Sequence, residues 1–565
     1  MIKQFLLKHP YTFFFGLATL VYVIGIVYVP LMDVDATQYA SISLEMLNSG
    51  DYLHVIHHEK DYLDKPPLIF WLGALFYKLF GVHVWSYRLP SFLFTILGIY
   101  STYALGKLFY GKKTGLNAAL IIYTTQAFFL MNHDVRTDTI LTACIIFSSW
   151  QLAEFLQSGR FIYVLGGFTG IALGMLEKGP LGLVVPIMAI GTHILVRRDW
   201  KTLFKWQWLA GLLLTAVLLI PMCIGLYEQF DLHPEKVVNG RQGVSGLRFF
   251  FWEQSFGRIT GENVWKDDST VLFFTHTFVW SFIPWFLPAI MAFFSRLGQL
   301  IRSGFKSTET EFLTLGGFLL PFIALSLSHY KLPHYVFVLY PFAAIFTASW
   351  LSELELKPSS FLKWTKVQSI LCLVMALLLV VFNVWFFPVY TSLYVSIATV
   401  LLLVLLLYAY RQYKHLPEIK LYSVSVFTAV FINFLLNTNF YPQLLNYQGG
   451  TVASRYVKGK NIRADNCYSL NETSFALDVN TGINWVDGTP ERIEKALKVK
   501  DELWLFTNHD GFMFAKDNYI ISDYKRIEHF HVTAMTLPFL NPSTRKEVLE
   551  ERYILQLKGL LREKK

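Results

Sequence analysis

Charged residues are scarce in this sequence. Asp, Glu, Lys and Arg make up only 16% of its 565 residues, whereas an average soluble chain is about 25% charged. Hydrophobic residues account for 54% of the chain and aromatic residues for 17%, and the mean hydropathy is +0.41. Over this length, such a composition excludes a soluble globular protein, a disordered chain and a nucleic-acid scaffold. It indicates many membrane spans.

Cysteine is also rare, and its placement excludes two further classes. Of the four cysteines, Cys144, Cys223 and Cys372 lie inside apolar runs and only Cys467 lies outside them. The sequence therefore has no evident disulfide framework and no CxxC metal signature. It also has no internal repeat and no low-complexity tract. No nucleic-acid partner is expected, because the basic residues behind the net charge of +9 sit in short loops beside apolar runs.

Long apolar runs dominate what is present. A helix needs about 20 apolar residues, with about 17 as the lower end, to cross a bilayer. Thirteen runs meet this length: 11–31, 90–107, 114–131, 139–156, 161–177, 180–196, 206–226, 271–295, 312–328, 334–352, 368–388, 393–410 and 421–437. The first is too long for a signal-peptide core and lacks a small-residue cleavage site, so we interpret it as a span. A further run, 66–82, is short and carries Lys78 near its end.

Basic loop residues orient these spans. If 66–82 lies at the outer interface without crossing, the basic groups of the loops fall on one side: Lys3, Lys8, Lys107, Lys112, Lys113, Arg160, Arg197, Arg198, Lys201, Lys205, Arg296, Arg302, Lys306, Lys357, Lys363, Lys366, Arg411, Lys414 and Lys420. The positive-inside rule places that side in the cytoplasm. We therefore predict an all-α polytopic protein of the cell membrane with about thirteen transmembrane helices, a cytoplasmic N-terminus and an extracytoplasmic C-terminus.

The predicted domains follow from a shift in composition near residue 438. Residues 1–437 form the transmembrane domain, with an outer loop and interfacial helices at 32–89. In the tail, 502–507 and 519–533 have the pattern of strands, and 491–499 after Pro490 has that of a helix. Residues 438–565 are therefore predicted to be a small extracytoplasmic soluble α/β domain.

Ionisable residues gather at the outer ends of the spans. They are Asp33, Asp35, His54, His57, His58, Asp64, Lys65, Asp134, Arg136, Asp138, Glu177, Lys178, Glu228, Glu253, His329, Lys331 and His334. Such groups at the edge of hydrocarbon are costly and usually functional. Any one of them is explained well enough by interfacial anchoring, but the set favours a polar cavity open to the outer face.

Asp35 is the most informative member of this set. Asp35 fits the N-cap of a helix that ends near Gly50, with Gln38 as the partner in a capping box. A capping carboxylate stays ionised, so Asp35 could also act as a general base toward a hydroxyl. Asp138 opens the span 139–156 just after Arg136, and N-capping explains it as well.

Several cations accompany these carboxylates. Lys65 precedes Pro66 at the start of the predicted helix 66–82, where its charge opposes the helix dipole unless an anionic ligand binds both. Lys178 lies at another outer turn, and Lys331 and Tyr335 flank a third. Carboxylates alone would suggest a cation pathway. Carboxylates with cations suggest a phosphate-bearing lipid and a group that is transferred from it.

These motifs occur in a familiar order. The chain reads Asp35-x-x-x-Tyr39-Ala40, then Asp64-Lys65-Pro66, Asp138, Glu177-Lys178-Gly179-Pro180, and Ser328-x-x-Lys331-x-Pro333-x-Tyr335 with Pro341. The order resembles the membrane glycosyltransferases of the aminoarabinose transferase type, which are relatives of the protein O-mannosyltransferases and share the GT-C fold. The motifs cover about residues 1–350, and the remainder is similar only in its layout of thirteen spans plus an outer soluble domain.

The resemblance implies a polyprenyl-phosphate-linked sugar donor and transfer at the outer leaflet, usually with inversion and without a nucleotide sugar. It implies catalytic roles for Asp35 and Asp138. The residues expected to bind donor phosphate are Lys65, Lys331, Arg136, Lys178 and Tyr39. This chain has Ala36 and Gln38 where the family often has Glu and Arg, and Asp64 where it often has Glu. These differences weaken an assignment of lipid A as the acceptor.

A divalent metal is a further implication of the resemblance. Some family members hold an ion between the acid before Lys-Pro and a histidine on a later outer loop. Here the candidates are Asp64 and Glu253, and Gln254 stands where a histidine would be expected. Such a set would make a poor zinc site and a weak oxygen-ligand site. We therefore expect no required cofactor and no tightly bound metal.

Alternatives to a glycosyltransferase remain at this stage. A transporter or lipid flippase would favour ionisable residues near the bilayer midplane and repeated halves with broken helices, and the sequence has neither. An inactive membrane scaffold is a third reading. The acceptor could be a lipid, a glycan or a protein hydroxyl, and membrane lipids are expected partners in each case.

Overall fold

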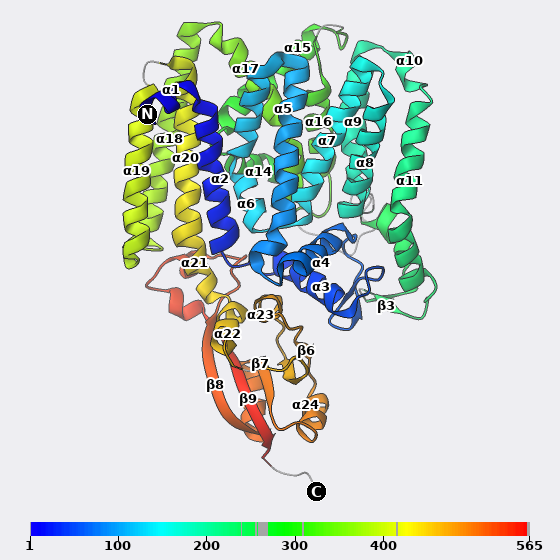
Figure 1. Ribbon diagram of the computed structural model, residues 1–565, viewed down its shortest axis with the longest axis vertical. Coiled ribbons are helices and arrows are strands. Elements are labelled where there is room, and N and C mark those ends of the chain that lie inside the picture. Colours follow the sequence, from blue (N-terminus) through cyan, green and yellow to red (C-terminus); the bar gives the residue numbers. More distant parts are fainter. Residues whose placement is uncertain are drawn as a thin grey trace.

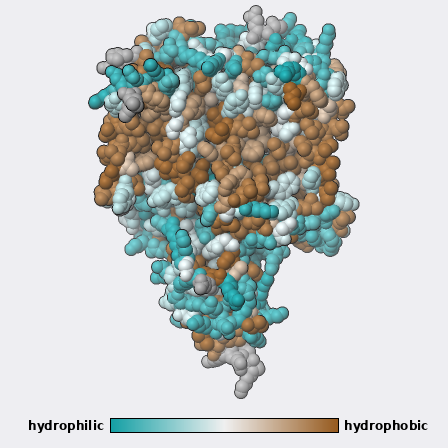
Figure 2. Space-filling model, viewed as in Figure 1, coloured by the Kyte–Doolittle hydropathy of each residue, from teal (hydrophilic) through white to brown (hydrophobic). Residues whose placement is uncertain are grey.

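The computed structural model describes residues 2–238, 240–254, 257, 269–307, 310–413, 416–460 and 462–561. Helices form a large bundle, and a smaller domain with a sheet projects from one end of it (Figure 1). Figure 2 shows a broad hydrophobic band across this face of the bundle, with hydrophilic surface at the rim away from the smaller domain and over that domain. The chain is therefore a multi-pass membrane protein. Lys414 lies outside the described residues, as do residues 239, 255–256 and 258–268 of the loop between the predicted spans 206–226 and 271–295.

The first half of the bundle comprises α1 (Ile2–Lys8), α2 (Pro10–Tyr28), α3 (Asp35–Ser49), α4 (Leu68–Phe80), α5 (Val84–Tyr123), α6 (Gln126–His133), α7 (Thr137–Ser158), α8 (Phe161–Lys178), α9 (Leu181–Arg197), α10 (Trp200–Leu203) and α11 (Gln207–Leu226). The second half comprises α12 (Gly246–Arg248), α14 (Phe273–Ser281), α15 (Phe286–Arg302), α16 (Leu313–Ser326), a 3₁₀ helix (Pro333–Leu339), α17 (Tyr340–Glu355), α18 (Pro358–Trp385), α19 (Leu393–Tyr413) and α20 (Pro417–Leu435). Two short hairpins are β1–β2 (Ile56–His57, Lys60–Asp61) and β3–β4 (Val237–Val238, Arg241–Gln242).

Nine helical segments within the described residues are long and apolar enough to cross a membrane. Three shorter apolar helices, α4, α9 and α16, accompany them. In Figure 1 α3 and α4 lie across the lower end of the bundle, whereas most other helices run along its length. The run predicted at 66–82 is thus a short helix, which starts at Leu68 because two prolines precede it.

Three predicted spans differ in their extent from the observed helices. The runs 90–107 and 114–131 belong to a helical hairpin, because α5 breaks at Gly111, where φ is 84° and ψ is 171°. Only glycine adopts this conformation without strain. The two arms pack closely, since a Cβ added at Gly115 would lie 2.5 Å from the carbonyl oxygen of Tyr103. The run 271–295 is divided between α14 and α15.

The smaller domain is built on a five-stranded sheet in the order β6-β5-β7-β9-β8. Its strands are β5 (Cys467–Leu470), β6 (Val486–Asp487), β7 (Leu503–Asn508), β8 (Tyr519–His529) and β9 (Glu550–Leu560), and its helices include α22 (Gly449–Val457), α23 (Phe475–Thr481), α24 (Pro490–Leu497) and α25 (His509–Asn518). β5 pairs in parallel with β6 and β7, and β9 pairs antiparallel with β7 and β8. The predicted strands and helix correspond to β7, β8 and α24, but β8 ends at His529 and not at residue 533.

The smaller domain is fastened to the first outer loop by hydrogen bonds. The Gln448 side chain donates to the carbonyl oxygen of Leu31 at 2.9 Å and accepts from the amide of Asp33 at 2.8 Å. Helix α3 also packs against α23. The segment that enters α3 is therefore held between the bundle and the sheet domain.

Candidate active site

Asp35 lies at the start of α3, but it does not cap the helix as predicted. The N-cap residue is Val34, no side chain caps the helix there, and Asp35 is the first helical residue. Its carboxylate turns away from the backbone and accepts a hydrogen bond from Nη1 of Arg136. The Thr37 hydroxyl bonds instead to the Asp33 carboxylate, at 2.7 Å. The capping-box prediction is wrong because the strong tertiary partner Arg136 takes the Asp35 side chain.

Arg136 joins two carboxylates at the start of α7. It is the N-cap residue of that helix, and its Nε donates to Oδ2 of Asp134 at 3.0 Å. Burial disfavours the guanidinium charge, but the charges of Asp134 and Asp35 outweigh this and raise the pKa of Arg136 above its usual value. Arg136 is thus a permanent cation that faces the cavities described below.

Asp138 is a buried carboxylate in the first turn of α7, not its N-cap. Its side chain is 1% exposed, and Oδ1 accepts a hydrogen bond from Nζ of Lys178 at 2.6 Å. Nε2 of His334 lies 3.7 Å from the other oxygen. The Lys178 ammonium also lies over the ring of Tyr335, 4.1 Å from its centre. Three separate chain segments therefore meet at Asp138.

Two adjoining cavities open beside these residues. A cavity of about 760 Å³ is lined by the charged groups Asp35, Asp134, Arg136 and Asp138, by the imidazole of His334, and by apolar side chains that include Trp280, Phe337, Phe440 and Leu444. A second cavity of about 180 Å³ shares Asp35, Arg136 and His334 with the first. The arrangement combines a charged end with a long apolar wall, which suits a lipid that carries a charged head.

The smaller cavity collects three further residues that the sequence singled out. Lys65 and Asp64 line it just before α4, and Tyr39 lines it from the second turn of α3. Tyr39 is 2% exposed and packs edge-on against Phe70. Burial, together with the negative charge of Asp35, raises the pKa of Tyr39 well above its usual value. Tyr39 is therefore a neutral hydroxyl donor at the cavity wall.

Two of the predicted cations, Lys331 and Lys178, line neither cavity, whereas Arg136 and Lys65 do. The Lys331 side chain is buried, and Nζ donates to the carbonyl oxygen of Ser269 at 3.1 Å and to its hydroxyl at 3.3 Å. Among the described residues, those that line the two cavities do not include Lys331. Lys331 thus braces the turn that carries Tyr330 and His334, both of which do line them.

The candidate metal ligands do not fit a metal ion. The Glu253 carboxylate is paired with Arg241 at 2.8 Å and with Arg248 at 3.4 Å. Gln254 lines the smaller cavity with Asp64, but its amide nitrogen donates to the Asp64 backbone oxygen. Two arginines already neutralise the carboxylate that would have to bind the ion, so no step of the chemistry is assigned to a metal here.

Sequence reasoning missed the residue that holds these loops together. Arg88 in α5 is fully buried, and its guanidinium donates to the carbonyl oxygens of Ile26, Val29, Pro30 and His133 at 2.5–3.0 Å. It thereby links the end of α2 to the end of α6, just before Asp35 and Asp134. The available signal was a lone arginine within an apolar stretch, where a charge is costly and usually functional.

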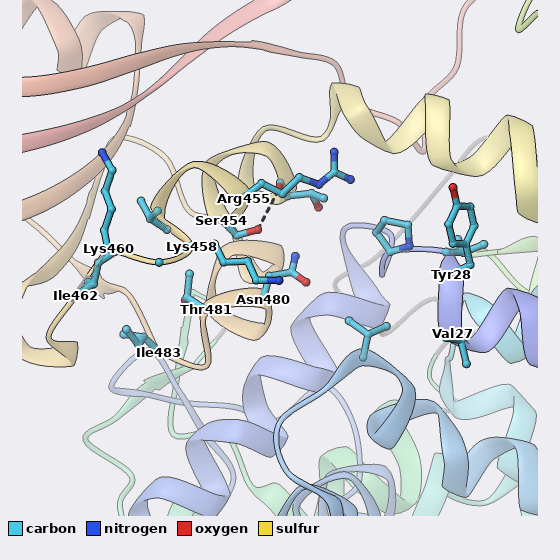
Figure 3. Close-up of a pocket in the computed structure, with 16 residues that line it drawn as sticks. Val27, Tyr28, Ser454, Arg455, Lys458, Lys460, Ile462, Asn480, Thr481 and Ile483 are labelled. Carbon is cyan, nitrogen blue, oxygen red and sulfur yellow. Dashed lines mark hydrogen bonds between the residues drawn. The ribbon is translucent and has the colours of Figure 1, made fainter. Parts of the chain in front are cut away.

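A third cavity, of about 470 Å³, lies between the end of α2 and α22. In Figure 3 Val27 and Tyr28 border one side of it, and Ser454, Arg455 and Asn480 lie across from them. Lys460 also lines this cavity, but its ammonium is held by Asp523 at 2.6 Å. None of the residues predicted for catalysis or phosphate binding lines it.

Comparison with known proteins finds relatives that are similar in sequence and in fold. Residues 64–224 match the family described as dolichyl-phosphate-mannose-protein mannosyltransferase. The undecaprenyl phosphate-alpha-4-amino-4-deoxy-L-arabinose arabinosyl transferase of Edwardsiella ictaluri is 28% identical over 354 residues, which are 60% of this chain and 59% of that protein. The protein of the same name from Pseudomonas aeruginosa PAO1 is 28% identical over 54% of this chain and 52% of its own length.

A solved structure extends the likeness to nearly the whole fold. ArnT from Cupriavidus metallidurans, bound to undecaprenyl phosphate, has a TM-score of 0.72 at 17% identity and covers 96% of this chain and 97% of its own. The chain thus shares the fold of ArnT, although it spans only a little over half the length of the relatives named above. The resemblance to the aminoarabinose transferase type, expected from the order of the motifs, is confirmed.

Proposed function

We propose that this chain is an integral-membrane glycosyltransferase that moves a sugar from a polyprenyl-phosphate donor to a lipid, glycan or protein acceptor at the extracytoplasmic face. One observation carries the proposal: Asp35 and Arg136 stand side by side at the junction of a large, partly apolar cavity and a small polar one. The relatives named above act with undecaprenyl phosphate or bind it, and this geometry suits such a donor.

Each group has a role in the proposed reaction. The acceptor hydroxyl oxygen attacks the anomeric carbon, the bond from that carbon to the phosphate oxygen breaks, and the hydroxyl proton passes to a carboxylate. Asp35 is the base, because it lines both cavities. Asp138 is the second carboxylate, and its pairing with Lys178 orders the start of α7. The lipid phosphate leaves with the electron pair of the broken bond.

The cations stabilise the leaving phosphate. Negative charge grows on the phosphate as the sugar bond breaks, and preorganised cations lower the barrier to that step. Arg136 and Lys65 border the smaller cavity, and Tyr39 adds a neutral donor there. The apolar side chains of the larger cavity, such as Trp280 and Phe337, would contact the polyprenyl chain. Thirteen crossings, with the sheet domain outside, would place this site at the outer leaflet.

Substitution of Asp35 tests the proposal. Asp35→Asn removes the base but leaves Arg136 its contact with Asp134, so we expect normal membrane expression and a loss of transfer of about 10²-fold or more. Mass spectrometry of surface lipids and glycans, from cells with and without the protein, would identify the product that is then quantified. The matched control is Asp510→Asn on the exposed start of α25. Near-normal transfer by Asp35→Asn would contradict the assigned role.

A further inference from the structure

A cluster of histidine and aspartate side chains lies where the first outer loop meets the sheet domain. His57 is the last residue of β1, His58 lies in the turn that follows it, and Asp478 comes from α23. The side chains of His58 and Asp478 are 5% and 0% exposed, and His57 is 7% exposed. None of the three lines the cavities of the candidate active site.

The three residues are spaced as metal ligands. One ligand atom from each of His57, His58 and Asp478 lies within 4.8 Å of the other two. In the part of the chain that the structure describes, no other group of three such residues has this spacing. Nε2 of His57 is buried and has no hydrogen-bond partner. A buried polar atom left unsatisfied destabilises the fold, and a bound cation would satisfy it.

The surroundings of the cluster orient its ligands. Nδ1 of His58 lies 3.4 Å from Oδ1 of Asp487, while its Nε2 faces Asp478 at 2.8 Å. The Asp478 carboxylate is held by the Ser41 hydroxyl at 2.8 Å and by the amide of Trp485 at 3.0 Å. Metal-binding histidines commonly present their second ring nitrogen to a carboxylate in this way, which fixes the ring and its tautomer.

We propose that His57, His58 and Asp478 form a zinc site that fastens the first outer loop to the sheet domain. Two imidazole nitrogens and one carboxylate are a ligand set that zinc accepts, with water in the fourth position. The ion would bridge two parts of the chain more than 400 positions apart in sequence. The role is structural, because the site is separate from the cavities where Asp35 and Arg136 lie.

A proton is the competing occupant of this cluster. Burial alone would lower the pKa of His58, but its hydrogen bonds and the charges of Asp478 and Asp487 raise it to about 9. A protonated His58 would satisfy Asp478 and Asp487 but not Nε2 of His57. A measurement of zinc uptake distinguishes zinc from a proton as the occupant, because only a zinc site requires His57.

The test measures zinc binding to the full chain without a polyhistidine tag. Protein purified with a chelator is dialysed at pH 8 against zinc chloride, and its metal content is determined by mass spectrometry. We expect one zinc per chain in the wild type, a rise in Tm with zinc but not with magnesium, and a loss of both effects in His57→Gln. His54→Gln is the matched control, since His54 belongs to the same loop and pairs with Asp51 and Glu228.

Asp487→Asn refines the test, because it leaves the three ligands in place. We expect zinc affinity to fall by about 10–100-fold, the usual effect of losing a carboxylate that orients a ligand. X-ray absorption of the zinc-loaded protein should give only nitrogen and oxygen ligands, at about 2.0–2.2 Å. Wild-type protein that takes up no zinc, or His57→Gln that binds it as tightly as His54→Gln, would overturn the proposal.

Discussion

At the scale of single residues, the candidate site is a set of matched charges. Asp35 and Asp134 share Arg136, and Asp138 holds Lys178. No carboxylate in this group therefore stands without a nearby cation. An anionic donor phosphate that enters the smaller cavity would compete with Asp35 for Arg136, which would release the Asp35 carboxylate as a base.

Lys65 gives a prediction at this scale. Lys65→Ala removes a cation from the wall of the smaller cavity, and a lost charge-assisted hydrogen bond is worth about 1.5–3 kcal/mol. We therefore expect KM for the lipid-phosphate donor to rise by about 10-fold or more, as measured by initial rates against donor concentration. Lys331→Ala should raise KM less, because its ammonium bonds to Ser269 outside the cavity lining.

The control for this prediction is Lys78→Ala, which removes an exposed lysine from α4. Its donor dependence should match that of the wild type. An unchanged KM in Lys65→Ala would leave Lys65 as a contact for lipid headgroups.

At the scale of elements, Arg88 holds the ends of α2 and α6 against the start of α5. Its hydrogen bonds to carbonyl oxygens at the ends of α2 and α6 use groups that no helical turn can satisfy. Arg88→Met fills a similar volume but leaves several buried carbonyl groups unpaired. We expect a stability loss of about 3 kcal/mol or more, seen as a lower Tm of the purified protein.

Arg88→Lys is a second variant, whose Tm is compared with those of Arg88→Met and the wild type. A lysine keeps the positive charge but cannot form the fork of hydrogen bonds that a guanidinium forms. We therefore expect an intermediate Tm. A Tm equal to that of the wild type in both variants would show that the loop geometry does not depend on Arg88.

The joint between α22 and β8 should respond to pH. Nδ1 of His529 accepts a hydrogen bond from the amide of Gly449 at 3.1 Å, so the ring must be neutral. The pKa of His529 is lowered to about 4, mainly because the ring is buried. The charges of Arg552 and His531 also lower this pKa, whereas the charge of Glu550 raises it. Below about pH 6.5 the unfolded chain binds the proton more readily than the folded one.

It follows that this histidine stabilises the fold fully above about pH 6.5, and that its contribution disappears as the pH falls through about 4. Denaturant unfolding of the full chain across this window should show stability declining toward acid. The decline should be shallower in His529→Gln. The exposed His531 provides the matched variant, His531→Gln, which should change the slope far less, because its charge makes the smallest contribution to the pKa of His529. Equal slopes in all three proteins would contradict the prediction.

At the scale of the whole molecule, the two chain ends lie at opposite ends of the structure (Figure 1). The N-terminus and α10 lie at the end of the bundle away from the sheet domain, so Lys201 in α10 falls on the N-terminal side as the positive-inside rule requires. The sheet domain and helices α3 and α4 of the first outer loop lie at the same end of the bundle (Figure 1).

Single-cysteine labelling tests this topology. With an impermeant thiol reagent and intact cells, we expect Asp510→Cys to react from outside and Lys112→Cys to react only after permeabilisation. Both positions are exposed in the structure, so accessibility depends on membrane side and not on burial. Labelling from outside at loop 353–367 would refute the orientation.

The sequence alone determined the features that depend on local composition. Apolar runs predicted where helices lie, because a bilayer demands length and hydrophobicity that few other structures show. The order of Asp35, Lys65, Asp138, Lys178 and Lys331 predicted the resemblance that the comparisons confirm. Local signals are less secure at helix starts, because Asp35 and Asp138 both fit an N-cap by sequence whereas the N-cap residues are Val34 and Arg136.

Only the tertiary structure decided which of these residues meet. The pairs Asp35–Arg136 and Asp138–Lys178 join positions 101 and 40 residues apart, and no local pattern specifies such contacts. The same holds for Arg88, because its partners are backbone carbonyl groups, which any sequence would supply. His58 and Asp478 also meet only in the folded chain, because the sheet domain docks on α3. Long-range pairing depends on how helices pack, and packing is a property of the assembled bundle.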